Sequence, residues 1–213
     1  MAEKTWININ GVNKEAIPWI KVSGTWKKCI PWVRVNGVWK KCYSAGGSPS
    51  YIKIMEVTTA TDSDPFNHPL IRLAQTFTAL SNVQGSSLLS VRVMEGGRHH
   101  IGNNTGWQIY NTGSNGNPAN AISDMVTVVA TDWPLGGWKD MTFPLYSPLE
   151  ANKVYALVGR AITIPEGNYL YWAWTSPNTY SGGRMYCSDD GGQTWGNYPS
   201  ICYTTVIQAL VNN

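Results

Sequence analysis

WININGVNKEAIP (residues 6–18), WIKVSGTWKKCIP (19–31) and WVRVNGVWKKCYS (32–44) are three copies of one thirteen-residue motif. In each copy aliphatic and polar residues alternate before a glycine, and in the third copy the turn reads Asn36-Gly37. Asn-Gly between alternating runs is a strong signal for a β-hairpin, because both central residues of the turn need positive φ. The sequence therefore predicts a tandem β-hairpin repeat over residues 1–43.

The role of this repeat follows from its size. A two-stranded hairpin alone is marginally stable in water, so three short hairpins must pack on one another or on another surface. One interpretation is a self-contained β-repeat; the other, compatible with it, is a docking module whose exposed tryptophans and lysines hold a partner. The tryptophans expected to serve assembly are Trp6, Trp19, Trp26, Trp32 and Trp39.

Charge is distributed unevenly along the chain. Residues 1–43 hold eight Lys or Arg against two Glu, and the rest holds eight against eleven acids, so +6 and −3 give the formal net charge of +3. A basic segment is compatible with nucleic acid, but these lysines lie near hairpin ends and no base-stacking motif accompanies them. We therefore expect no nucleic-acid partner, and either an acidic protein surface or solvent around the lysines.

The first residues lack the apolar stretch of a secretory signal, and no run of the sequence is long enough to span a bilayer. We expect no membrane insertion, and synthesis in a cytoplasm. The four cysteines fall into two sequence pairs, Cys29/Cys42 and Cys187/Cys202. A reducing compartment favours free thiols, while the positions of both pairs leave bridging open.

Residues 44–50, SAGGSPS, contain no large apolar side chain and are typical of a linker. From residue 51 to 213, short apolar runs alternate with turns, helical periodicity is almost absent, and a helical pattern around 119–124 is weak. The expected strands are 51–57, 71–77, 88–94, 106–110, 124–130, 138–143, 153–160, 169–175, 184–188 and 203–210. About ten strands at such spacing indicate an all-β fold with a β-sandwich.

Several segments of this second region follow a widespread domain pattern; they are 73–79, 89–93, 149–158, 171–174, 178–183 and 188–195. Over about residues 51–210 the chain resembles jelly-roll β-sandwich domains of bacterial surface proteins and phage structural proteins, which are similar to carbohydrate-binding modules. The hairpin repeats resemble segments of phage tail and virion proteins. The resemblance implies a jelly-roll fold and a bacteriophage origin.

One further motif fits the Asp-box pattern, Ser-x-Asp-x-Gly-x-Thr-Trp; its members are Ser188, Asp190, Gly192, Thr194 and Trp195. We expect Asp190 to accept hydrogen bonds from turn amides, Gly192 to adopt an unusual φ, and Trp195 to pack beneath the turn. In families such as sialidases the box is a folded hairpin away from the catalytic centre. A structural role is therefore expected.

Sugar binding requires aromatic faces that stack on pyranose rings, with polar groups nearby. We expect Leu170, Trp172 and Trp174 to point into the core. The residues expected to contact a ligand are Tyr169, Tyr171 and Tyr180 and, in a second polar region, Trp107, His99 and His100. Core packing for the aromatics and a solvated loop for the histidines are the alternatives.

Other chemistries have little support. The spacing of Asp62, Asp64 and Asn67 is compatible with calcium but supplies too few ligands to specify a site, and no zinc spacing is present. No nucleophile elbow, metalloprotease or phosphate-binding motif occurs. We expect no catalytic residue, no metal and no cofactor.

These features together predict a non-enzymatic phage virion protein of the tail-fibre type, located in the virion. Residues 1–43 would anchor it to other virion proteins or to sister copies, with a homotrimer expected because several weak sites gain avidity. Residues 51–213 would bind a host-surface glycan. The alternatives are a capsid or tail decoration protein without a ligand, and a polysaccharide-degrading enzyme.

Overall fold

The computed structural model describes residues 50–96, 104–163 and 169–211 in full, and the backbone of six short strands within residues 5–41. These six strands form three antiparallel pairs: β1 (Thr5–Ile9) with β2 (Val12–Ala16), β3 (Trp19–Val22) with β4 (Thr25–Lys28), and β5 (Trp32–Val35) with β6 (Val38–Lys41). Each motif copy thus forms one hairpin. The side chains of the five assembly tryptophans, and both Cys29 and Cys42, lie outside the described residues.

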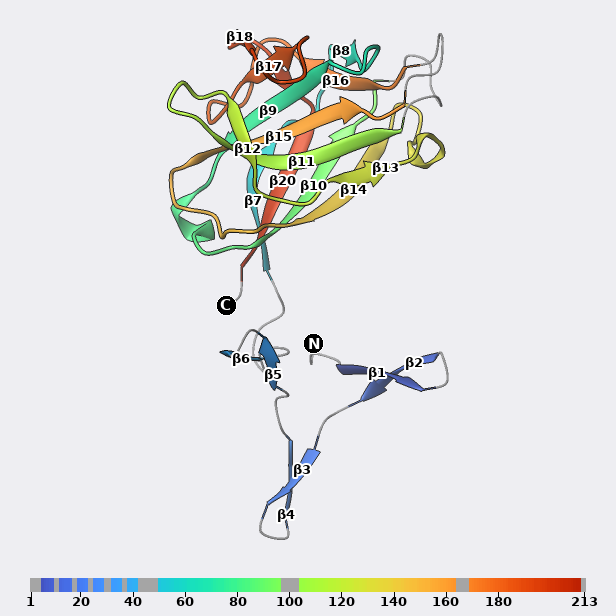
Figure 1. Ribbon diagram of the computed structural model, residues 1–213, viewed down its shortest axis with the longest axis vertical. Helices are drawn as coiled ribbons and strands as arrows, with labels where there is room; N and C mark the ends of the chain where they lie inside the picture. The colour runs from blue at the N-terminus through green and yellow to red at the C-terminus, as the bar shows by residue number, and fades with distance from the viewer. Residues whose placement is uncertain are drawn as a thin grey trace. The chain divides into compact units, whose positions relative to one another are not determined.

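The chain falls into two compact units with the boundary between Ser50 and Tyr51. The second unit contains two large sheets (Figure 1). One has the order β14 (Trp138–Pro144), β10 (Leu88–Met94), β20 (Thr205–Val211) and β7 (Ser50–Glu56). The other has the order β12 (Pro118–Ala121), β11 (Thr105–Thr112), β15 (Val154–Ala161), β9 (Arg72–Thr78), β17 (Met185–Ser188) and β18 (Gly196–Tyr198), with β13 (Val126–Val128) paired to β11.

A third, small sheet completes the unit and has the order β19 (Cys202–Tyr203), β16 (Tyr171–Thr175) and β8 (Asp62–Pro65). Figure 1 shows β9, β15 and β11 in front of β7, β20 and β10, as the two layers of a sandwich. Strands distant in sequence are neighbours, such as β10 with β20 and β9 with β17. The described residues include two short 3-10 helices, Ser81–Val83 and Ala130–Asp132, and no α-helix. The all-β prediction is confirmed.

Alternating side chains fill the space between the layers. On β10, Leu89, Val91 and Val93 are fully buried, while Ser90 and Arg92 lie on the opposite face. The facing sheet contributes apolar side chains of its own to the same core, among them Leu73, Phe77, Ile109 and Leu157. The period of two predicted for residues 88–94 therefore decides which face of β10 is buried.

An aromatic cluster lies at the end of the core that the third sheet covers. Trp107 meets Trp172 edge to face with ring centroids 4.8 Å apart, and Phe66 meets Trp107 in the same way at 5.7 Å. Tyr203 stacks on Trp172 at 4.0 Å with an interplanar angle of 11°. All four side chains are buried. Such rings provide large apolar area together with a preferred geometry, so they fix β16 and β19 against the sandwich.

Two sequence-based expectations are corrected here. Trp107, expected to contact a ligand, is 0% exposed and donates its indole N–H to Thr105 Oγ1 at 2.9 Å, so its ring belongs to the core. The weak helical pattern at 119–124 is wrong: Pro118–Ala121 is the strand β12. The polar residues before Trp107 favoured a ligand site, but on β11 Trp107 shares the buried face with Ile109.

We expect Gly159→Ala to destabilise the fold. A Cβ at Gly159, on β15 opposite Trp107, would lie 2.7 Å from Trp107 Cζ3 and 3.0 Å from Phe66 Cζ, and both rings are held by buried neighbours. Overpacking of this kind costs about 1–3 kcal/mol. Urea denaturation of the full chain measures it. Gly113→Ala is the control, because the nearest atom to its new Cβ is the end of the Asn115 side chain. Equal stability of the two variants would contradict the prediction.

Candidate functional site

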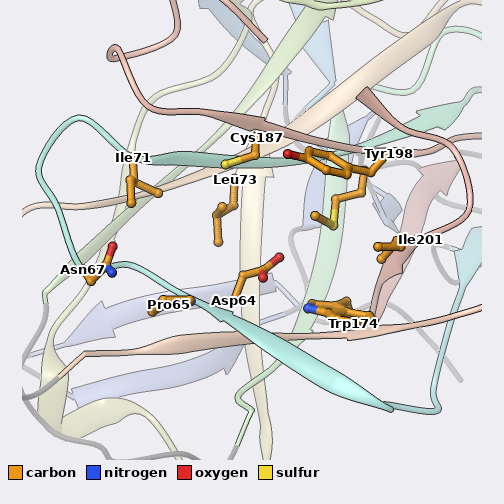
Figure 2. Close-up of a pocket in the computed structure, with 10 residues that line it drawn as sticks. Asp64, Pro65, Asn67, Ile71, Leu73, Trp174, Cys187, Tyr198 and Ile201 are labelled. Atoms are coloured by element: carbon orange, nitrogen blue, oxygen red, sulfur yellow. The ribbon is translucent and has the colours of Figure 1, made fainter. Parts of the chain in front are cut away.

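A cleft of about 290 Å³ opens between the small sheet and the edge of the large sheet, at the lower end of the range for ligand pockets. Figure 2 shows β8 and β16 below it and β9 and β17 above. Its lining is mostly apolar, with a few polar groups from separate elements; the residues are Asp64, Pro65, Asn67, Ile71, Leu73, Trp174, Met185, Cys187, Tyr198 and Ile201. This mixture is typical of a small-molecule site.

The carboxylate of Asp64 is the charged group of the cleft. β8 places it there, and the hydroxyl of the fully buried Tyr203 donates to its Oδ2 at 2.9 Å. Burial raises the pKa of Asp64 above its ordinary value, the hydrogen bond from Tyr203 lowers it, and Asp62 raises it again. Figure 2 shows the carboxyl group pointing into the cleft.

Two aromatic residues border the same space. Trp174, on β16, is half-buried, and its indole nitrogen is turned toward Asp64 (Figure 2). That indole N–H makes no hydrogen bond of regular geometry among the described residues, but as a donor near the Asp64 carboxyl it lowers the pKa of that group. Tyr198, on β18, is 44% exposed. The cleft thus combines aromatic rings with a donor and an acceptor at neighbouring positions.

Cys187 contributes a thiol that is unsuited to nucleophilic chemistry. Burial, together with the carboxylates of Asp189 and Asp64, raises the pKa of the Cys187 thiol to about 11. The thiol form therefore dominates at neutral pH, and the thiolate is the reactive species. Cys187 and Cys202 are both free, and Cys202 is fully buried.

The tyrosines expected to bind a ligand lie elsewhere. Tyr169 and Tyr171 are half-buried and do not line the cleft. Tyr180 is also half-buried, and its hydroxyl accepts a hydrogen bond from the amide of Thr78 at 3.2 Å. His99 and His100 lie outside the described residues. As expected, Leu170 and Trp172 point into the core, whereas Trp174 lines the cleft.

Calcium gains no support from the described geometry. Asp62 and Asp64 line two different cavities, and Asp62 Oδ1 accepts from the amide of Ser63. Within residues 50–96, 104–163 and 169–211, no group of three or more His, Cys, Asp or Glu is arranged to hold a metal ion.

The Asp-box turn next to the cleft has the hydrogen bonds expected of its motif. Asp190 accepts from the amide of Gln193 at 2.9 Å and from the amide and hydroxyl of Thr194, the latter at 2.6 Å. The hydrogen bonds from Thr194 and the Ser188 hydroxyl hold the pKa of Asp190 well below its ordinary value. Gly192 has φ of +93°, and Trp195 packs against a small apolar cluster on the outer face of the sheet. These contacts give the box a structural role.

Sequence reasoning missed the cleft because its residues come from segments with weak patterns. β8 is a four-residue strand with two acids, and β18 is three exposed residues. Asp64 and Asn67 had drawn attention as oxygen ligands, and Trp174 as one of a row of aromatics. Tyr198 carried no signal beyond its place after the Asp-box.

Fold and site together define a class: an all-β sandwich protein with an aromatic, carboxylate-bearing cleft at the edge of one sheet. No model of a known protein family matches the chain, and no curated protein matches it either. Within the described residues, no helix is long and apolar enough to cross a membrane.

We expect Tyr203→Phe to raise the pKa of Asp64 further. The variant keeps the stacked ring but removes the hydrogen bond that favours the carboxylate, while burial continues to favour the neutral acid. A carbon-detected NMR titration of the Asp64 carboxyl measures the change. Tyr146→Phe is the control, because it removes a comparable bond, from Tyr146 to Asp124 at 2.6 Å, at an exposed position. An unchanged Asp64 pKa in Tyr203→Phe would contradict the assignment.

The same variant has a consequence for stability. The pKa of Asp64 in the folded protein lies above its unfolded value of 3.8, so the folded state binds more protons between these two pKa values. The free energy of unfolding therefore decreases as the pH rises through this range. Tyr203→Phe raises the folded pKa of Asp64 and so extends to higher pH the range over which this loss of stability accumulates. We therefore expect a loss of about 1 kcal/mol at pH 7, below the roughly 1.5–3 kcal/mol of a hydrogen bond to a charged group, because Asp64 is partly solvated.

Proposed function

We propose that residues 51–211 form a glycan-binding module and that the cleft beside Asp64 receives one sugar unit. The observation that supports this most directly is the gap between the Asp64 carboxylate and the indole N–H of Trp174, which is turned toward it but makes no hydrogen bond of regular geometry with it. A sugar hydroxyl can donate to the first and accept from the second. The indole N–H of Trp174 is buried without a regular partner, which is costly, so a ligand that accepts a hydrogen bond from it gains affinity.

The apolar part of the cleft supports the same ligand class. Ring C–H groups of a pyranose pack on aromatic faces, and Trp174 and Tyr198 are both placed at the cleft. Asn67, which is exposed at one side, adds an amide that can both donate and accept. A volume of about 290 Å³ suits a single ring better than a long chain segment.

Binding without hydrolysis fits this site best. Glycosidases need two carboxyl groups on either side of the scissile bond. Among the described residues that line the cleft, Asp64 is the single acid, and Tyr203 holds one of its oxygens. The thiol of Cys187 is protonated at neutral pH and offers no replacement nucleophile.

The proposal places this module on a phage virion. It relies on the likeness of the repeats in residues 1–43 to virion proteins and on their net charge of +6, from eight basic and two acidic residues. In this arrangement the hairpins contact other virion proteins or sister copies, and the sandwich contacts the host surface. Three weak cleft sites on one trimer would raise the overall affinity through effective concentration.

We expect the full chain to bind a subset of host-envelope glycans on a glycan array. Tyr198→Ala should weaken that binding about tenfold, the loss that corresponds to about 1.4 kcal/mol of stacking and buried area. Tyr198 is preferred over Trp174 because it is 44% exposed and its removal leaves the core intact. Asp64→Asn should weaken binding as well, since it replaces a charged acceptor.

Tyr146→Ala is the matched control, because Tyr146 is 65% exposed and does not line the cleft. If the full chain binds none of the host-envelope glycans on the array, a decoration protein without a ligand would be favoured. If wild type and Tyr198→Ala bind the same glycans with equal affinity, the cleft is not the binding site. New reducing ends after incubation with host polysaccharide would establish an enzyme instead.

The mass of the full chain in solution tests the proposed trimer. We expect light scattering of the full chain to give three times the 23.5 kDa of one copy, because isolated hairpins are too small to be stable without packing partners. A strict monomer across the micromolar range, with no virion protein retained on it, would contradict the anchoring role.

A further inference from the structure

A second cavity adjoins the cleft at the Asp-box turn. It has a volume of about 140 Å³, and its lining includes Asp189, Asp190 and Thr194. Cys187 and Tyr198 line both this cavity and the cleft, so the two cavities share part of one wall. In Figure 2 the hydroxyl end of Tyr198 is directed along that wall toward Cys187. We call the second cavity the Asp-box pocket.

Tyr198 is placed to support one ligand across both cavities. It lies on β18, opposite Met185 of β17, and is 44% exposed. Its ring extends back along its own strand, because a Cβ at Gly196 would lie 3.4 Å from Tyr198 Cε2 and 3.5 Å from the hydroxyl oxygen. An exposed aromatic side chain therefore borders the cleft at one end and the Asp-box pocket at the other. Such a ring can pack against the C–H face of a sugar.

The described lining of both cavities is negatively charged. Asp64 lines the cleft, Asp189 and Asp190 line the Asp-box pocket, and no described Lys, Arg or His lines either of them. Arg72 contacts the same turn by donating to the carbonyl of Gly191, but it lines neither cavity. No ion pair within the described residues includes Arg72 or any of the three carboxylates.

The thiol of Cys187 is affected by the carboxylates of both cavities. It contacts Asp189 Oδ1 at 3.9 Å, and after burial the charges of Asp189 and then Asp64 raise its pKa. Asp190 remains ionised, because the hydrogen bonds from Thr194 and Ser188 hold its pKa well below the ordinary value. An anionic ligand would therefore meet like charge in both cavities, which is a means of rejecting it.

On the basis of the glycan-binding function proposed above, we propose that the cleft and the Asp-box pocket together bind one saccharide segment that carries no carboxylate, sulfate or phosphate group. One sugar ring lies in the cleft, the segment crosses Tyr198, and donor groups of the next unit face Asp189. A carboxylate only accepts hydrogen bonds, so these donors are hydroxyl groups or an ammonium group. The volume of about 140 Å³ suits a substituent or the edge of a ring better than a whole ring.

Matched saccharides that differ only in charge test this inference. We expect the full chain to bind neutral or amine-bearing forms of one saccharide, and to bind the uronic acid form about fivefold more weakly, the ratio for two unit charges about 4 Å apart in water. Calorimetric titration measures the dissociation constants. An amine-bearing form that binds more tightly than its N-acetylated form, by a margin that decreases with added sodium chloride, identifies an ammonium donor. Equal affinities that do not depend on salt identify hydroxyl donors.

Asp189→Asn removes one charge from an exposed position of the Asp-box pocket and should reduce the discrimination against the uronic acid form. Asp140→Asn is the matched control, because it removes the same charge from an exposed side chain on β14 of the other sheet. It should keep the full discrimination. Equal discrimination by Asp189→Asn and Asp140→Asn would overturn the role of the Asp-box pocket.

The comparison of neutral and acidic forms uses the wild type alone, so it remains decisive if a variant fails to fold. A uronic acid form that wild type binds as tightly as the neutral form would overturn this inference and leave the glycan-binding function standing. If wild type binds no glycan of any charge, the glycan-binding function itself is contradicted, and this inference with it.

Discussion

The stacking of Tyr203 on Trp172 is the interaction on which the described structure most depends. The two rings lie 4.0 Å apart between centroids and are both buried, and Trp172 in turn meets Trp107 of the large sheet. The small sheet has few strands and little area of its own, so its position relies on this packing. Because the ring of Tyr203 is fixed, its hydroxyl is fixed too, and that hydroxyl holds Asp64. The core thereby determines the orientation of the Asp64 carboxylate, the single acid among the described residues that line the cleft.

A buried amide reinforces this arrangement. Gln75 is fully buried on β9, accepts a hydrogen bond from the amide of Tyr203 at 2.8 Å, and donates to the carbonyl of Thr76. Polar groups in a core are stable when each finds a partner, and a satisfied set specifies one arrangement of the chain. The link joins β19 to the large sheet where no ladder of backbone hydrogen bonds does so. Apolar packing supplies the stability here, and the polar contacts supply the register.

The sequence predicted the fold far better than the site, for a physical reason. Period-two alternation in residues 88–94 predicts both the strand β10 and its buried face, because a one-residue shift would expose Leu89, Val91 and Val93 together. The cleft has no such constraint. It brings together Asp64 of β8, Trp174 of β16 and Tyr198 of β18. More than a hundred residues of chain separate β8 from β16. Trp107 was expected at a ligand site because polar residues precede it, whereas alternation along β11 places it with Ile109 on the buried face.

β8 and β18 each end a sheet, and each pairs with one neighbour among the described strands. They border the cleft from opposite sides, and no described backbone hydrogen bond connects them. The cleft can therefore widen if the edge strands β8 and β18 bend apart, because no backbone hydrogen bonds between strands have to break. If the cleft binds a glycan as proposed, this arrangement would let it accept branched or substituted variants of one saccharide. Affinity for a range of related surface polymers would then come at the expense of selectivity for one of them.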